Sequence, residues 1–213
     1  MTSVAIKICG VTTAEALEAA IAARADYVGF NFYAPSPRSL RLKEAAELAP
    51  RAEGRITRVG VFVDAEDTVI ADAIAAGGLE VLQLHGAETP QRVTEVKARF
   101  GLTVWKALPI SAGRDVGLAT AYKDAADLIL FDAKTPKGSL PGGMGLAFDW
   151  SLLALYRGET PWGLAGGLTP DNAAEAVRTT NAPLVDTSSG VESAPGIKDV
   201  ERIAAFCKSV RAA

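Results

Sequence analysis

The sequence contains few of the residues that form disulfides or bind metal ions. Its 213 residues include two cysteines, Cys9 and Cys207, and one histidine, His85. Two cysteines at opposite ends of a chain do not make a disulfide framework, so we expect a reducing compartment and a cytoplasmic protein. A metal site would need further His or Cys side chains at ligand spacing, and the sequence has no such motif. We therefore expect no metal.

The chain also lacks long hydrophobic runs and a large charge excess. No stretch approaches the roughly eighteen apolar residues of a membrane span, and the N-terminus does not join a basic region to a long apolar one. We expect no membrane contact and no signal peptide. The net charge of −3 gives no general electrostatic reason to bind nucleic acid. Any anion must therefore be held by a local site.

What the chain does have is a regular alternation of short apolar runs and longer helical patterns. Hydrophobic residues make up 49% of the sequence, which is ordinary for a soluble globular protein, and the length suits one domain spanning 1–213. The apolar runs predict strands at residues 4–9, 27–32, 57–63, 81–84, 102–107, 128–131, 163–165 and 183–185. Apolar spacing predicts helices at residues 13–24, 42–49, 65–76, 90–100, 114–124, 150–156, 171–178 and 199–210.

Strict alternation of strands and helices implies parallel strands joined by crossover helices. Eight such units in this length predict an α/β fold, a single (β/α)8 barrel of eight parallel strands with surrounding helices. An open, doubly wound sheet is the alternative. One connection, residues 133–148, is long and rich in glycine, and we expect a lid there.

Reactive side chains gather where the predicted strands end. In such barrels the active site lies at the carboxyl ends of the strands. The polar residues at these ends are Lys7, Cys9, Asn31, Arg38, Asp64, His85, Lys106 and Asp132. Their clustering at one end of the barrel is stronger evidence of a site than any one of them.

Small residues after the last two strands predict a phosphate site. Gly166 and Gly167 follow the seventh strand, and Ser188 and Ser189 follow the eighth. Glycines let backbone N–H groups approach an anion, and Thr169 is placed to cap the next helix, whose positive end favours phosphate. The simpler alternative is that both are tight turns without a ligand. The pair together favours phosphate.

Cys9 and Asp132 are the candidates for proton transfer. Lys7 lies two residues before Cys9 on the same side of the strand, and a nearby cation lowers the pKa of a thiol. Asp132 follows an apolar strand, where a buried carboxyl suits a general acid. The alternatives are that Cys9 is a small buried hydrophobe, and that Asp132 caps a helix or pairs with Lys134.

Arg38 stands in a stiff loop with prolines, where a guanidinium could grip a carboxylate through two parallel hydrogen bonds. An exposed loop arginine is the alternative, and this residue alone does not choose between them.

Several motifs occur in a fixed order from the first strand to the last helix. They are Lys7-Ile8-Cys9-Gly10, Ser36-Pro37-Arg38, Leu82-Gln83-Leu84-His85-Gly86, Phe131-Asp132-Ala133-Lys134, Ala165-Gly166-Gly167-Leu168 and Asp186-Thr187-Ser188-Ser189-Gly190. Together they resemble the phosphoribosylanthranilate isomerase family. Thr187 is a departure, since the family more usually has valine there.

The resemblance implies an Amadori rearrangement in tryptophan biosynthesis, catalysed by a barrel without metal or organic cofactor. It implies Cys9 as general base, Asp132 as general acid and Arg38 as the partner of the anthranilate carboxylate. His85 and Asp186 would contact the substrate, and the two glycines and two serines would bind its phosphate. We expect this small phosphorylated substrate as the partner, and a monomer or homodimer. The alternatives are another phosphosugar isomerase or epimerase barrel, and a non-catalytic barrel that binds a phosphorylated ligand.

Overall fold

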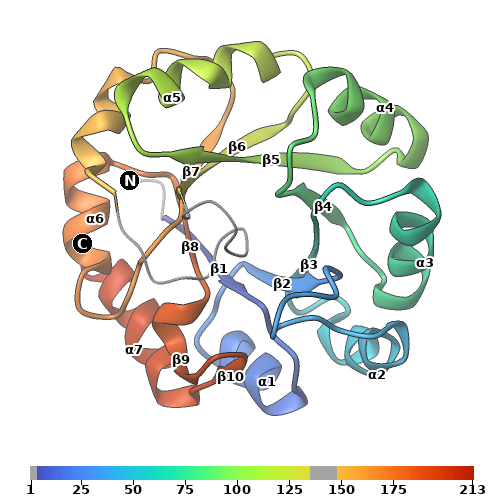
Figure 1. Cartoon of the computed structure of the whole chain (residues 1–213). Coiled ribbons are helices and arrows are strands. Elements are labelled where there is room, and N and C mark those ends of the chain that lie inside the picture. The colour runs from blue at the N-terminus through green and yellow to red at the C-terminus, as the bar shows by residue number, and fades with distance from the viewer. Residues whose placement is uncertain (1–3, 135–147) are drawn as a thin grey trace.

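The computed structural model describes residues 4–134 and 148–213 and shows a closed barrel of eight parallel strands. Each strand pairs with the next, and β1 pairs with β8 to close the ring (Figure 1). The predicted (β/α)8 barrel is therefore confirmed, and the alternative of an open sheet is wrong. The strands are β1 (Ala5–Cys9), β2 (Tyr27–Asn31), β3 (Thr57–Phe62), β4 (Val81–Leu84), β5 (Thr103–Ile110), β6 (Leu128–Ala133), β7 (Trp162–Leu164) and β8 (Leu184–Thr187).

Helices surround the barrel on its outside (Figure 1). They are α1 (Ala14–Ala22), α2 (Leu42–Ala52), α3 (Asp67–Gly77), α4 (Pro90–Phe100), α5 (Gly113–Gly117), α6 (Ala173–Thr180) and α7 (Val200–Arg211). Three 3-10 segments, η1 (Leu118–Tyr122), η2 (Trp150–Leu155) and η3 (Ser189–Val191), complete the helical structure of the described residues. The described part of the chain has no helix long and apolar enough to cross a membrane.

Two hydrophobic layers hold this arrangement together. One lies between the strands and the helices. The other fills the inside of the barrel with alternate residues of the strands, Val59, Val81, Trp105, Ala107, Leu130, Ala165 and Leu184. Because successive side chains of a strand point to opposite faces, each strand contributes to both layers. This double burial explains why the strands are continuous apolar runs in the sequence.

Several predicted helix boundaries differ from the observed ones, and the predicted helices at 114–124 and 150–156 are partly or wholly 3-10 in the structure. The helix predicted at residues 42–49 continues past Pro50 to Ala52. A proline in the last turn already has a helical φ and removes one hydrogen bond, so the helix tolerates it. Thr169 does not cap α6, because the helix starts later with Asn172 as its N-cap. The Asn172 side chain instead accepts from the backbone N–H of Thr169 and donates to the carbonyl of Gly167.

A short hairpin follows β8, and it was not predicted. Its strands are β9 (Glu192–Ala194) and β10 (Ile197–Lys198), with an antiparallel pairing, and it lies beside α7 (Figure 1). The turn uses Gly196, whose φ of 82° is in the left-handed region that glycine adopts without strain. The predicted lid at residues 133–148 lies almost wholly outside the described residues.

Candidate active site

A layer of polar side chains lies above the apolar interior of the barrel. Each of its members stands two residues after an interior residue, so the two share a strand face. The pairs are Ala5 and Lys7 on β1, Val81 and Gln83 on β4, Leu130 and Asp132 on β6, and Leu184 and Asp186 on β8. All four polar side chains are buried. The carboxyl ends of four strands thus converge on one set of ionisable and polar groups.

Lys7 and Asp186 form a buried ion pair beside Cys9. The Nζ atom of Lys7 lies 2.8 Å from Oδ2 of Asp186, and the Lys7 side chain is completely buried. A Cβ atom on Gly29 would lie 2.8 Å from Sγ of Cys9 and 3.3 Å from Nζ of Lys7. A glycine on the neighbouring strand β2 therefore provides the space in which the thiol and the ammonium group come together.

The thiol of Cys9 does not have the lowered pKa that its neighbour Lys7 led us to expect. Burial raises the pKa of Cys9; Lys7 opposes this rise, and the negative charge of Asp186 adds to it. The expectation is wrong because burial of the thiol outweighs the effect of Lys7, which also neutralises Asp186 at hydrogen-bond distance. Burial likewise raises the pKa of Asp186; Lys7 opposes it and the nearby charge of Asp132 increases it.

Asp132 contacts His85, and not Lys134, among the described residues. Its Oδ2 atom lies 3.0 Å from Nε2 of His85, and its Oδ1 atom accepts the backbone N–H of Ala133 at 2.8 Å. The other ring nitrogen of His85, Nδ1, lies 2.8 Å from Nε2 of Gln83. One chain of hydrogen bonds therefore joins the ends of β4 and β6. Asp132 and His85 were predicted site residues, and Gln83 was not.

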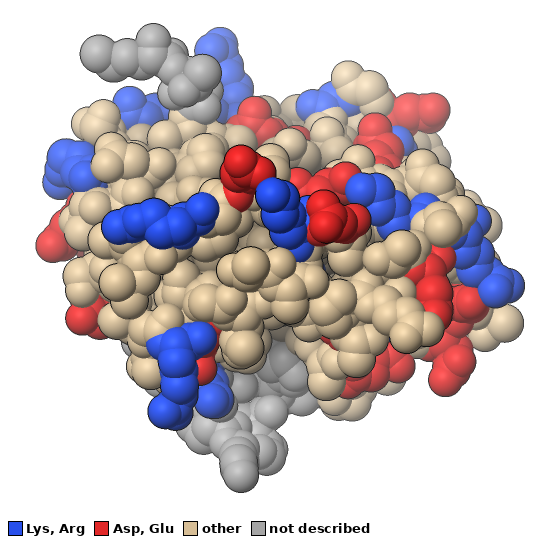
Figure 2. Space-filling view, turned by 90° about the horizontal axis from the view of Figure 1, so that it is seen from above, with Lys and Arg blue, Asp and Glu red and all other residues tan. Residues whose placement is uncertain are grey.

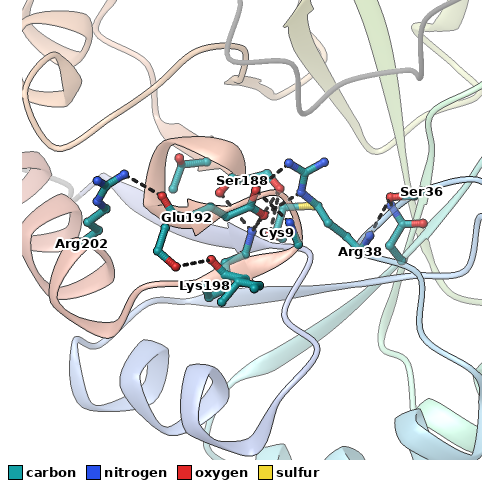
Figure 3. A network of polar contacts seen from close by, with 12 residues as sticks. Cys9, Ser36, Arg38, Ser188, Glu192, Lys198 and Arg202 are labelled. Carbon is teal, nitrogen blue, oxygen red and sulfur yellow. Dashed lines mark hydrogen bonds and ion pairs between the residues drawn. The ribbon is translucent and has the colours of Figure 1, made fainter.

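Arg38 forms a bidentate ion pair with a carboxylate, and that carboxylate belongs to the protein. Its Nε and Nη2 atoms each lie 2.7 Å from an oxygen of Glu192 (Figure 3). Glu192 also accepts from Nζ of Lys198 at 2.6 Å. The simple alternative of an exposed arginine is wrong, since Arg38 is 8% exposed. The pairing of Glu192 was not predicted, because the partners lie 154 residues apart in sequence.

The cluster around Glu192 reaches Cys9 through Ser188. Nζ of Lys198 donates to the carbonyl of Ser188 at 3.0 Å, and the Ser188 hydroxyl donates to the carbonyl of Cys9 at 3.0 Å (Figure 3). Arg202 donates from α7 to the carbonyl of Glu192. The hairpin after β8 thus places two cations, Arg38 and Lys198, next to the end of β1.

The two turns predicted to hold phosphate lie side by side. Gly166 and Gly167 both have positive φ, 86° and 66°. A Cβ atom on Gly190 would lie 1.8 Å from the carbonyl oxygen of Leu168, so the turn after β8 approaches the turn after β7 very closely. The hydroxyl of Thr187 donates to the same carbonyl at 2.7 Å, which gives this departure from the family pattern a structural role.

The backbone amides of the β7 turn are available for a ligand. Within the described residues, neither Gly166 nor Gly167 donates its N–H to another group. Backbone amides of this kind in a positive-φ turn form an anion-binding concavity. The helix N-terminus that we expected beside them is displaced, because α6 starts at Ala173.

A buried pair behind the site was also not predicted. Lys106 lies within β5 and not at its end, and its Nζ atom contacts Oε2 of Glu88 at 3.0 Å and the carbonyl of Gly86 at 2.8 Å. Glu88 accepts in turn from the backbone N–H groups of Asp64 and Gly86. Lys106 therefore supports the turn that follows His85. The prediction that it lies at a strand end and lines the barrel mouth is wrong.

The barrel mouth combines a thiol, a carboxyl and cationic groups. Residues 4–134 and 148–213 contain no cluster of three or more His, Cys, Asp or Glu side chains placed to hold a metal. On the side of the barrel that Figure 2 shows, Lys and Arg side chains lie among Asp and Glu side chains and form no extended basic region that would favour a polyanion. Fold and site define a barrel enzyme for a small anionic substrate, with side chains suited to acid–base chemistry.

Comparison with known proteins identifies the family. Residues 6–209 match the family model of N-(5'phosphoribosyl)anthranilate (PRA) isomerase. The chain belongs to this family and is an isomerase of the tryptophan pathway. It is 50% identical to N-(5'-phosphoribosyl)anthranilate isomerase of Parvibaculum lavamentivorans, over 99% of this chain and all of that protein. It is 53% identical to the enzyme of Paracoccus denitrificans, over 96% and 95% of the two chains.

Solved structures agree with this assignment. Phosphoribosyl anthranilate isomerase from Thermotoga maritima is 35% identical and superimposes with a TM-score of 0.87, covering 99% of this chain and all of that one. A second solved isomerase, 33% identical with a TM-score of 0.84, is in complex with reduced 1-(o-carboxyphenylamino)-1-deoxyribulose 5-phosphate. That alignment covers 99% of this chain and all of the other.

Proposed function

We propose that this chain converts N-(5'-phosphoribosyl)anthranilate to 1-(2-carboxyphenylamino)-1-deoxyribulose 5-phosphate, with Cys9 as general base and Asp132 as general acid. The observation that carries the proposal is the arrangement of the two groups in one barrel mouth. They lie at the ends of β1 and β6, which β7 and β8 separate. Two groups on different sides of a sugar can act on its ring oxygen and on its C2 atom while the sugar stays in one bound orientation.

The chemistry begins with ring opening. Asp132 gives its proton to the ring oxygen as the bond from C1 to that oxygen breaks, and the lone pair of the anthranilate nitrogen forms the C1–N double bond. Cys9, as thiolate, then takes the proton from C2. The electrons of that C–H bond form the C1–C2 double bond and return a lone pair to nitrogen. Loss of the proton of the C2 hydroxyl and protonation of C1 give the ketone.

The base must lose its proton before this step. Burial holds the pKa of Cys9 above its ordinary value, and the positive charge of Lys7 acts in the opposite direction. Since Lys7 shares its charge between Asp186 and the thiol, protonation of Asp186 would leave more of that charge to the thiolate. We therefore assign to Lys7 the stabilisation of the thiolate. Asp186 and His85 are assigned to contacts with the sugar of the substrate.

The charged ends of the substrate have separate partners. Arg38 is the partner of the anthranilate carboxylate, and Glu192 keeps its guanidinium in a fixed orientation. Gly166, Gly167, Ser188 and Ser189 hold the phosphate through backbone amides and hydroxyls. Both contacts lie outside the bonds that change, so they fix orientation and do not select the reaction.

A turnover assay tests the proposed reaction against the other barrels. The fluorescence of N-(5'-phosphoribosyl)anthranilate is followed with enzyme, beside the aminoaldose substrate of the related histidine-pathway isomerase. Loss of the first signal with no turnover of the second supports the proposal. A preference for the second substrate contradicts it, and so does tight binding of a product analogue by calorimetry without any turnover.

We also propose that the chain forms one domain over 1–213, acts in the cytoplasm and assembles as a monomer or homodimer. Both cysteines are free thiols, and Cys9 must stay reduced to act as base. A related isomerase from Thermotoga maritima is dimeric, and monomers have been generated from it. Sedimentation should give the mass of one or two chains, and a larger assembly would contradict the proposal.

A further inference from the structure

Gln83 is a buried polar residue to which the proposed reaction gives no part. Its side chain is completely buried on the inner face of β4, two residues before His85. Its Nε2 atom faces Nδ1 of His85 at 2.8 Å, and its Oε1 atom has no hydrogen-bond partner among the described residues. An amide that uses one end on a histidine and leaves the other buried without a partner requires an explanation.

The contact determines which nitrogen of His85 carries the proton. A carboxamide nitrogen only donates, so Nδ1 of the ring must accept and must be unprotonated. The ring proton is then on Nε2, from which it is donated to Oδ2 of Asp132 at 3.0 Å. A second proton on Nδ1 would set two N–H groups against each other at 2.8 Å. With its amide nitrogen toward the ring, Gln83 therefore opposes the imidazolium form of His85.

The surrounding charges favour that same imidazolium form. Asp132 contacts the ring directly, and Asp186 lies close enough for its carboxyl to be affected by both Asp132 and His85. The charged group next to these is Lys7, which is paired with Asp186. The two carboxyl groups thus attract positive charge to the ring, and the Gln83 amide nitrogen faces the ring from the other side.

We propose that Gln83 is a positioning residue, which keeps His85 neutral with its proton on Nε2 so that the exchangeable proton of the pair is held by Asp132. The inference rests on the proposed role of Asp132 as the acid. It explains how a carboxyl in contact with a histidine can be the proton donor. Oδ2 of Asp132 accepts from the ring through one lone pair and carries the transferable proton on its other side.

The chain offers a direct test because it has one histidine. Long-range 1H–15N spectra of the untagged, 15N-labelled protein contain the ring nitrogens of His85 alone. At neutral pH the parent should show a neutral ring protonated on Nε2. Gln83→Glu replaces the donor by an acceptor of the same shape, and its spectrum should show both ring nitrogens protonated. A parent ring protonated on Nδ1, or on both nitrogens, would overturn the proposal.

Kinetics of the same variants separate positioning from packing. Gln83→Glu should lower kcat by roughly 10²-fold, within the range expected for acid–base catalysis, with KM changed little. Gln83→Met has a similar volume and neither opposes nor accepts an N–H at Nδ1, so its ring should take up a second proton less readily than in Gln83→Glu, and kcat should fall less. Equal losses of kcat in the two variants would show a packing effect and contradict the proposal.

Failure of this proposal can be distinguished from failure of the proposed function. If Asp132→Asn retains turnover, the role of Asp132 fails, whatever the spectrum shows. If Asp132→Asn is inactive while Gln83→Glu has the parent's spectrum and kcat, the role of Gln83 alone fails.

Discussion

At the scale of single residues, the site depends on charges shared between more than two groups. Lys7 pairs with Asp186 and also acts on the Cys9 thiol, and Glu192 pairs with both Arg38 and Lys198. The effect of removing one group therefore depends on which partner is left, and it can have either sign.

The reactivity of Cys9 should reveal this sharing. Burial raises its pKa, so alkylation by iodoacetamide should reach half its maximal rate above the ordinary thiol value of about 8.5. Asp186→Asn removes a charge that opposes the thiolate and frees Lys7, so the midpoint should move to lower pH. Lys7→Met removes the stabilising cation, so the midpoint should move to higher pH.

Cys207 is the internal control for that experiment. Burial raises its pKa to about 11, so it should react slowly, and a Cys207→Ala background removes its contribution. Shifts of the midpoint in the same direction for Asp186→Asn and Lys7→Met would contradict the account.

Arg38 should affect substrate binding more than the chemical step. Arg38→Ala should raise KM about ten- to hundredfold, the value of a hydrogen bond to a charged group, with a smaller change in kcat. Glu192→Gln keeps the guanidinium while removing the protein's own carboxylate, and it should not raise KM in the same way. Steady-state kinetics with N-(5'-phosphoribosyl)anthranilate compare the two variants, and equal KM values for Arg38→Ala and the parent would rule out the role.

The sequence singles out candidate residues where the chemistry is local, and it does not reveal the pairs that they form. Cys9, Asp132 and Arg38 stand at strand ends or in a motif, so position along the chain was enough to select them. Their partners His85 and Glu192 lie 47 and 154 residues away from Asp132 and Arg38. Closure of the barrel sets those contacts, and no local pattern describes it.

At the scale of elements, the loops are held by buried polar contacts that local patterns do not reveal. Strand and helix order was predictable because each strand is apolar on both faces and each helix has an apolar stripe. The boundaries of the helices were less predictable than their order. For example, α6 begins at Ala173, because Asn172 forms hydrogen bonds with the backbone of Gly167 and Thr169 and occupies the N-cap position.

Glu88 should be the most sensitive of these contacts. Glu88→Gln leaves Lys106 buried with a neutral partner and should lower the free energy of unfolding by about 3–5 kcal/mol, as expected when one charge of a buried pair is removed. Urea unfolding measures the change. Glu18→Gln is the matched control, because its pair with Arg55 is exposed and should contribute almost nothing. Similar midpoints for the two variants would contradict a supporting role for Glu88.

A substitution at Gly190 should affect both the stability of the protein and its binding of phosphate. An alanine there would place Cβ 1.8 Å from the carbonyl of Leu168, so the turns after β7 and β8 must separate. Gly190→Ala should lower the free energy of unfolding by about 1–3 kcal/mol and raise KM. Gly117→Ala is the control, since its Cβ meets nothing within 4 Å. Unchanged KM in Gly190→Ala would separate this turn from the phosphate site.

At the scale of the whole molecule, four strands of the barrel, β1, β4, β6 and β8, each pass from an apolar interior residue to a polar site residue. The interior is apolar at Ala5, Val81, Leu130 and Leu184, and the next inward position on the same strands is ionisable or polar. This repeated step of two residues explains why one end of the barrel is reactive. It also explains why the family could be identified from short motifs at strand ends, while the polar network between them required the closed structure.

The central claim is that Cys9 and Asp132 transfer protons on opposite sides of one sugar. The most direct test is kcat for loss of N-(5'-phosphoribosyl)anthranilate fluorescence in Cys9→Ala and Asp132→Asn, beside the parent. The account predicts that each variant loses roughly 10²–10⁴-fold in kcat, with KM changed only a few-fold, since neither group is assigned to hold the substrate. A kcat within about threefold of the parent in either variant would contradict the account.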